Sequence, residues 1–273
     1  MLKEQIERSI YILREAKAKF RNIGVFWSTG KDSTAMLSLI REAFFGEVPF
    51  PVIFIDTGFH FKELLNFRDQ VAAEWNLDLK IAKVETEINP FDNSVRECCM
   101  VRKMQAAKQI VNKYGFDALI VSIRRDEHGL RSKERVMSPR DKDWRWHVFK
   151  DSANGDSPFE PLQDAELWNL YASDFGPNCD HVRIHPLLHW TELEIWQYIK
   201  LRNLPINPLY FSKDGWRYRS LGCWPCTKPI RSNAKTIDEI IEEIRVSKTS
   251  ERAGRHTEKE KYLMETLRAL GYF

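Results

Sequence analysis

The stretch FWSTGKDSTAML, residues 26–37, constrains the fold more than any other part of the sequence. It overlaps an apolar run at 23–27 that is rich in β-forming residues and reads as a buried strand. Apolar residues then recur at helical spacing, which predicts a helix over 33–45. A polar turn that contains glycine, set between a strand and a helix, presents backbone N–H groups where the helix dipole favours an anion.

Strands and helices alternate along the first half of the chain. The predicted strands are 23–27, 52–55, 79–85 and 118–123, and the predicted helices are 2–19, 33–45, 61–76 and 99–113. This alternation predicts an α/β fold with an open, doubly wound and mostly parallel sheet. Ligands of such sheets bind outside the carboxyl ends of the strands, where the turns after residues 27, 55 and 123 would meet.

The second half of the chain is less regular. Residues 124–182 are rich in charge, Trp, Pro and Asn, and we expect an irregular, lid-like insertion. A strand is predicted within 182–190. A helix should follow Thr191, with Glu194 completing a capping box, and another should follow Thr236. A last helix is predicted at 257–270. We predict one domain at 1–200, followed by a C-terminal extension of loops and helices at 201–273.

Composition places limits on the class of protein. The sequence has 273 residues and a net charge of only +3, so global charge argues weakly for a nucleic-acid partner. It contains no apolar run of about 18 residues, and its first residues are too charged for a secretory signal. We therefore expect no membrane association and a cytoplasmic location, where five cysteines argue against a disulfide framework.

Basic side chains are concentrated in two places. Solvated surface, a substrate lid and a nucleic-acid contact are all open interpretations of the first cluster, which Trp144 and Trp146 accompany. The first cluster comprises Arg124, Arg125, Arg131, Lys133, Arg135, Arg140 and Lys142, and the second Lys248, Arg252 and Arg255.

The pattern Ser28-x-Gly30-x-Asp32-Ser33 is too short for the nucleotide-binding P-loop. It resembles the pyrophosphate loop (PP-loop) of the ATP pyrophosphatase superfamily, which has the adenine nucleotide alpha hydrolase-like fold. FIDTG at 54–58, RRDE at 124–127 and TSERAGR at 249–255 resemble the phosphoadenosine-phosphosulfate reductase branch. Within that branch, stretches spread over most of residues 5–255 look most like the small, catalytic subunits of bacterial sulfate adenylyltransferases.

The resemblance implies a site that binds ATP and Mg²⁺ and releases pyrophosphate after attack on the α-phosphorus. It implies catalytic roles for Lys31, Asp32, Arg125 and Arg252. Its implied ATP-binding residues are Ser28, Thr29, Gly30, Lys31, Asp32, Ser33, Asp56, Thr57, Arg124 and Arg255. A lone histidine is more often structural than catalytic, and we expect a structural role for His60, His185 and His189. We expect Trp190, Trp196 and Tyr198 to be core residues.

Four cysteines depart from the sulfate adenylyltransferase pattern. Cys98 and Cys99 are adjacent, and Cys223 and Cys226 form a CxxC pair. This quartet resembles the [4Fe–4S] ligands of adenylylsulfate reductases and of DNA phosphorothioation proteins. Thiolates suit iron–sulfur clusters or zinc, although adjacent cysteines strain a single tetrahedral zinc site. Buried free thiols are the third interpretation, and a free thiol is the expectation for Cys179.

A reductase needs a nucleophilic thiol, and the resemblance implies that this thiol would lie near the C-terminus, in a Cys-Gly-containing tail. Residues 256–273 contain no cysteine, which argues against a self-sufficient reductase. Our leading hypothesis is adenylation of an acceptor oxygen for sulfur insertion, with DNA backbone phosphorothioation as the leading case and a cysteine desulfurase as sulfur donor. The first alternative is a sulfate adenylyltransferase small subunit with a GTPase partner. The second is tRNA thiolation or an adenylylsulfate reductase-like reaction. A homo-oligomer is among the open options.

Overall fold

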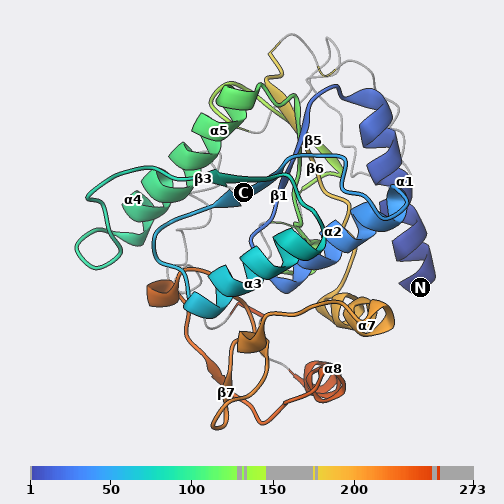
Figure 1. The fold of residues 1–273 in the computed structure, drawn as a ribbon, viewed down its shortest axis with the longest axis vertical. Coiled ribbons are helices and arrows are strands. Elements are labelled where there is room, and N and C mark those ends of the chain that lie inside the picture. The colour runs from blue at the N-terminus through green and yellow to red at the C-terminus, as the bar shows by residue number, and fades with distance from the viewer. Residues whose placement is uncertain are drawn as a thin grey trace, which may run out of the picture.

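A computed structural model describes residues 2–127, 131, 134–145, 175, 178–247 and 251–252. Its centre is a six-stranded sheet in the order β3-β2-β1-β4-β6-β5, parallel except for the edge strand β5 (Figure 1). The strands are β1 (Ile23–Phe26), β2 (Val52–Ile55), β3 (Leu79–Ala82), β4 (Ala118–Ile120), β5 (Met137–Arg140) and β6 (His181–Ile184). The predicted α/β class and the four predicted strands of the first half are confirmed.

The order of the strands reverses between β1 and β4. The chain runs from β1 outward to β2 and β3, and then returns to place β4 on the other side of β1. All four residues of β1 are buried, since both faces of this central strand are covered. A crevice outside the carboxyl ends of β1 and β4 is the place where such sheets bind ligands.

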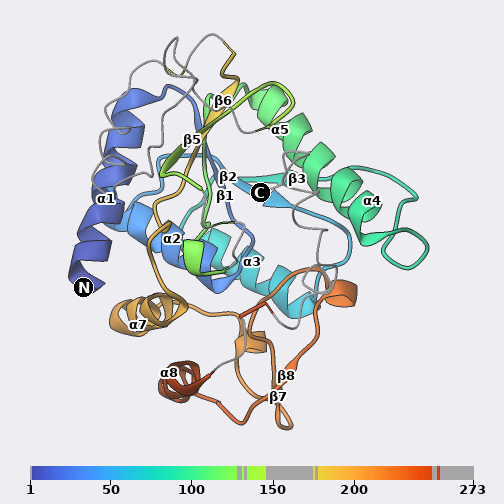
Figure 2. The same ribbon diagram turned by 180° about the vertical axis from the view of Figure 1, so that it is seen from behind.

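Helices cover the sheet from two sides. The helix α1 (Leu2–Lys19) packs against α2 (Lys31–Ala43), and α3 (Lys62–Glu74) follows β2. On the side of the molecule opposite to α1, α4 (Val95–Cys99) continues through a π-helical turn (Met100–Gln105) into α5 (Ala106–Tyr114), as both views show (Figures 1 and 2). The helix that we predicted at 99–113 therefore begins earlier, because Ser94 and Glu97 form a capping box.

The segment after β6 lies at one end of the molecule (Figures 1 and 2). It contains α7 (Glu192–Arg202), a hairpin of β7 (Trp216–Arg217) and β8 (Ile230–Arg231), and α8 (Ile237–Val246). Short 3₁₀ turns lie at Arg125–Glu127, Pro208–Tyr210 and Trp224–Cys226. The capping box predicted at Thr191 is present, and the helix predicted after Thr236 also begins with a capping box, formed with Glu239.

Two expectations for the second half need correction. The stretch 124–182 is not irregular throughout, because Met137–Arg140 forms β5, antiparallel to β6. Pro139 is the reason that the sequence does not predict this strand. Proline is tolerated there because β5 is an edge strand of the sheet. The strand predicted within 182–190 ends at Ile184.

Several predicted features lie outside the described residues: the helix at 257–270, Lys133, Trp146, Lys248, Arg255 and most of the insertion. The division at residue 200 stays a prediction. Among the helices of the described ranges, none is long and apolar enough to cross a membrane.

Candidate active site

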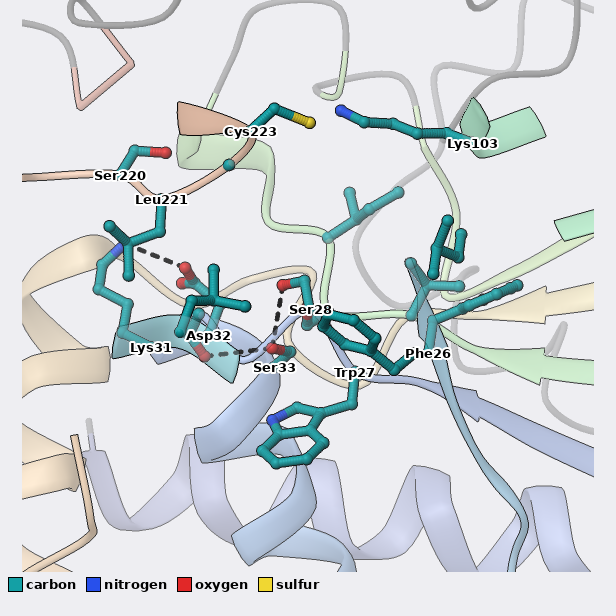
Figure 3. A pocket seen from close by; sticks show the side chains of 18 of the residues that line it. Phe26, Trp27, Ser28, Lys31, Asp32, Ser33, Lys103, Ser220, Leu221 and Cys223 are labelled. Atoms are coloured by element: carbon teal, nitrogen blue, oxygen red, sulfur yellow. Dashed lines mark hydrogen bonds and ion pairs between the residues drawn. The ribbon is translucent and has the colours of Figure 1, made fainter. Parts of the chain in front are cut away.

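A cavity of about 220 Å³ lies at the carboxyl ends of β1, β2 and β4, where the fold predicts a ligand. The loop that contains Tyr210 and Ser220–Cys223 closes its other side. Figure 3 shows Lys31, Asp32 and Ser33 at one end of the cavity, and Lys103 and Cys223 at the other, with the Lys103 amine and the Cys223 thiol pointing toward each other.

The PP-loop joins β1 to α2 at this cavity. The helix begins at Lys31, and Gly30 at its N-cap provides no side-chain cap. The backbone N–H of Lys31 instead donates a hydrogen bond to Tyr210 Oη, at 3.0 Å between N and O. The hydroxyls of Ser28 and Ser33 lie 3.1 Å apart. The start of α2 thus brings amide and hydroxyl donors to the cavity, as an anion site requires.

Thr29 has an unusual backbone conformation. Its φ of 62° lies in the left-handed region, which a β-branched residue adopts only at a cost in free energy. The side chain is buried, and its hydroxyl donates to the Ser28 carbonyl at 2.6 Å. Backbone strain of this kind gathers at functional sites, and here it shapes the predicted phosphate loop.

Four charged side chains form a closed ring behind the loop. Asp32 accepts hydrogen bonds from Lys31 Nζ at 3.0 Å and from Arg124 Nε at 2.6 Å. The carboxylate of Glu251 accepts from the same two cations, through Lys31 Nζ and Arg124 Nη2. The structure therefore brings the predicted residues Lys31, Asp32 and Arg124 together, and adds Glu251.

Ion pairing outweighs burial in setting the charge of Lys31 and Asp32. Burial alone would lower the pKa of Lys31, but the carboxylates of Asp32 and Glu251 outweigh it and raise that pKa above its ordinary value. Burial works in the opposite sense on Asp32, whose pKa is nevertheless lowered by Arg124 and Lys31. Lys31 and Asp32 are consequently both charged at neutral pH.

A second group of ion pairs flanks the ring. Glu127 Oε1 accepts a hydrogen bond from Arg252 Nη1 at 2.7 Å, and Glu127 also pairs with Arg131. All three residues line the cavity. Burial would raise the pKa of Glu127, but the arginines hold it below its usual range. The predicted catalytic residue Arg252 thus lies at the cavity, and its partner Glu127 belongs to the RRDE stretch.

The predicted adenosine residues lie at the end of β2. Thr57 lines the cavity together with Phe54 and His60. The Thr57 N–H donates to His60 Nε2 at 3.0 Å, and burial lowers the pKa of His60 to about 4. Asp56 does not line the cavity and instead accepts a hydrogen bond from the Gly58 N–H at 2.8 Å. It shapes the turn that positions Thr57.

Arg125 lies apart from the cavity lining. Its guanidinium donates to the Glu134 carbonyl at 2.8 Å and lies 3.5 Å from His189 Nδ1. The catalytic role predicted for Arg125 stays a prediction. His185 is fully buried and bonded to the Arg135 carbonyl, as a structural histidine should be. Trp190, Trp196 and Tyr198 are buried core residues, as predicted.

The four cysteines of the quartet converge on one small cavity. Cys98, Cys99, Cys223 and Cys226 all line a space of about 20 Å³ next to the nucleotide cavity. Burial, and then the three neighbouring cysteines, raise the pKa of Cys98 to about 11, so this thiol is protonated at neutral pH. Cys179 is not part of the lining; its thiol donates to the His181 carbonyl at 3.6 Å. Residues that are more than 120 positions apart in the sequence are thus brought together as the quartet predicts.

The donor set fits a thiolate-ligated group in chemistry, since four soft ligands from two chain segments face one space. Among the described residues, however, no three Cys, His, Asp or Glu side chains lie at the spacing of metal ligands. A [4Fe–4S] cluster at Cys98, Cys99, Cys223 and Cys226 is therefore a proposal and not a finding.

Two arginines of the first basic cluster lie inside the protein, whereas its Lys142 is exposed, so a nucleic-acid contact stays a prediction for the rest of the cluster. Arg124 and Arg140 are buried, and Arg140 pairs with the buried Glu134 at 3.0 Å. Trp144 is also buried, against His181 and Arg183. These side chains hold the fold together and are not available to bases or phosphates of a polymer.

Three residues of the site were not identified by the sequence analysis. Tyr210 and Lys103 line the nucleotide cavity, and Glu251 closes the charged ring. Glu251 lies within the TSERAGR stretch, and Lys103 lies four residues after the Cys98–Cys99 pair, whereas Tyr210 belongs to no motif named above. The signal was present, but only the fold shows which member of a motif faces the loop.

A PP-loop at the switch point of a parallel sheet, with cations gathered at its helix start, defines a nucleotide-binding α/β protein. The profile of the phosphoadenosine phosphosulfate reductase domain matches residues 22–229, and the chain belongs to this family of enzymes. The chain is 40% identical to sulfate adenylyltransferase subunit 2 of Proteus mirabilis, over 99% of this chain and 97% of that protein. The subunit 2 of Zymomonas mobilis is also 40% identical, over 100% and 97%.

Solved structures share the fold at low sequence identity. FMN adenylyltransferase of Candida glabrata superposes with a TM-score of 0.59 at 18% identity, covering 97% of this chain and 80% of that one. The phosphoadenylyl-sulfate reductase of Candida auris gives 0.54 at 20% identity, covering 81% and 90%. These likenesses support the α/β architecture alone.

Proposed function

We propose that this protein transfers the adenylyl group of ATP to an oxygen of an oxyanion and releases pyrophosphate, with sulfate as the acceptor. The observation that carries the proposal is the set of donors at the start of α2, where Lys31, Ser28 and Ser33 meet Arg252 across one cavity. The full-length similarity to sulfate adenylyltransferase small subunits supports sulfate, and implies a GTPase subunit as partner.

The reaction requires no redox step. An acceptor oxygen bonds to the α-phosphorus, and the bond from that phosphorus to the oxygen bridging to the β-phosphorus breaks. Pyrophosphate leaves with that electron pair, and Lys31 and Arg252 would stabilise the charge that develops on it. Mg²⁺ would neutralise the phosphates, with Asp32 as its nearest carboxylate in the loop. Thr57 and Phe54 would border the adenosine.

The test is isotope exchange between pyrophosphate and ATP. We expect exchange that depends on added sulfate, measured with and without a sulfate adenylyltransferase GTPase subunit, because exchange detects a reversible adenylation whose equilibrium is unfavourable. Lys235→Ala is the matched control for the removal of Lys31, because Lys235 is exposed and does not line the cavity. An exchange rate that does not depend on sulfate, either with or without the GTPase subunit, would contradict sulfate as the acceptor.

A second candidate is favoured by one observation, the convergence of the four cysteines beside the nucleotide cavity. In this reading, the adenylated oxygen belongs to a nucleic acid, DNA or tRNA, and sulfur from a cysteine desulfurase displaces AMP. A [4Fe–4S] cluster held by the quartet would supply iron–sulfur chemistry when bound. Exchange that depends on DNA or tRNA, and not on sulfate, would favour this candidate.

A further inference from the structure

A carboxylate from the C-terminal part of the chain engages Lys31, a cation of the cavity lining, and Arg124, which lies behind that lining. Glu251 accepts hydrogen bonds from Lys31 Nζ through one oxygen and from Arg124 Nη2 through the other. The side chains of Lys31 and Arg124 are 1% and 0% exposed, and that of Glu251 is 6% exposed. Water screens these contacts little, so the Coulomb attraction between the charges is stronger than in a surface ion pair, and removing one partner leaves a costly buried charge.

Carboxylates and phosphates compete for the same donors. Both are oxyanions that lysine and arginine bind through charge-assisted hydrogen bonds. In the ring, two cations face two carboxylates, Asp32 and Glu251, and no positive charge is left over. A phosphate in the cavity can therefore engage Lys31, which lines it, fully only if one carboxylate releases this lysine, and Glu251 would release Arg124 at the same time.

Asp32 and Glu251 differ in how they are held. Asp32 is in the first turn of α2, next to Lys31, so its backbone is held by the helix. Glu251 comes after the end of α8, and no described helix or strand contains it. Arg252, the next residue, pairs with Glu127 at the cavity. The same short segment thus contributes one group that competes with phosphate and one that attracts it.

We propose that Glu251 is an internal competitor of ATP, which holds Lys31 and Arg124 in the empty site and must release them when the phosphates bind. Nucleotide binding then includes the displacement of the 251–252 segment. This inference rests on the proposed use of ATP.

The test compares the dissociation constants of wild type, Glu251→Gln and Glu251→Asp for an ATP analogue with a methylene bridge between the α- and β-phosphorus, by calorimetry. Glu251→Gln removes the competing charge, and we expect about tenfold tighter binding, equivalent to about 1.4 kcal/mol. Glu251→Asp retains the charge but retracts it by one methylene, and should be intermediate. The control Glu242→Gln, whose side chain is 67% exposed, should bind as wild type does.

Thermal unfolding provides a second readout. Without nucleotide, Glu251→Gln should melt below wild type because two buried cations lose a partner. With saturating analogue, its melting temperature should rise by more than that of wild type. Equal or weaker binding in the variants would overturn the inference and assign Glu251 to holding the cations in place for phosphate. If wild type and all variants fail to bind the analogue, the proposed function itself is contradicted.

Discussion

Thr57 Oγ1 lies 3.2 Å from Cys223 Sγ, and both residues line the nucleotide cavity as well as the cysteine cavity. The two spaces therefore share a wall. A group bound by the quartet would sit next to a bound nucleotide, so the state of the thiols and the occupancy of the ATP site should influence each other.

Iron analysis after purification without oxygen tests the quartet. If it holds a [4Fe–4S] cluster, about four irons and four sulfides should accompany each chain. Cys99→Ala and Cys223→Ser should then lose the iron and the visible absorbance, because each removes one ligand. Cys179→Ser is the matched control and should keep both. A folded wild-type chain with neither iron nor zinc would leave the cysteines as free thiols.

Removing the amine of Lys31 should reduce turnover strongly. Lys31→Ala deletes the cation at the start of α2, and we expect kcat/KM for pyrophosphate release to fall by about 10²–10³-fold. The stability of the variant must be measured in parallel, since Asp32 and Glu251 lose a buried partner. Activity within a few fold of wild type, in a folded variant, would place the phosphates elsewhere.

Arg140 should matter for stability and not for nucleic-acid binding. Arg140→Ala leaves the buried carboxylate of Glu134 without its ion pair, and breaking such a pair costs about 3–5 kcal/mol. Urea unfolding measures this loss. A variant as stable as wild type that has lost affinity for DNA would contradict the buried ion pair and restore the basic stretch as a nucleic-acid surface.

His185 makes stability depend on pH. Burial lowers the pKa of His185 to about 4, whereas an unfolded histidine titrates near 6.5. The unfolded state therefore binds more protons between these values, and the contribution is present above about pH 6.5 and is lost as the pH falls toward 4. At about 1.4 kcal/mol per pKa unit, the loss is about 3 kcal/mol.

The measurement is the free energy of unfolding at several pH values in wild type and His185→Gln. The variant should lose less stability between pH 7 and about 4.5 than wild type does. In the wild type, Nε2 of His185 has no hydrogen-bond partner among the described residues, so a protonated imidazole would be buried with this N–H unpaired. Identical pH profiles would show that His185 does not titrate in this way.

The strands and the PP-loop could be predicted from sequence because their signals are local. Apolar runs of four residues, a polar turn and a helical period mark β1, the loop and α2 without reference to the rest of the chain. The capping boxes at Thr191 and Thr236 are local in the same sense. Strand β5 was missed because Met-Ser-Pro-Arg has no strand signature, and only pairing with β6 makes it a strand.

The charged ring could not be predicted because its members come from three distant segments. Glu251 reads as an exposed acid in a basic motif, yet tertiary packing buries it against Lys31 and Arg124. Arg140 would be taken for a surface charge for the same reason, although it is buried. Sequence spacing indicates which residues carry charge, but not which charges neutralise one another.

The position of the cleaved bond tests the account most directly. The protein is incubated with Mg²⁺, sulfate and ATP labelled at its α-phosphorus, in the presence of a sulfate adenylyltransferase GTPase subunit, and the labelled products are separated. The account predicts that the label appears in adenylylsulfate, with one pyrophosphate released for each. Label that appears in ADP, with release of inorganic phosphate, would contradict adenylyl transfer.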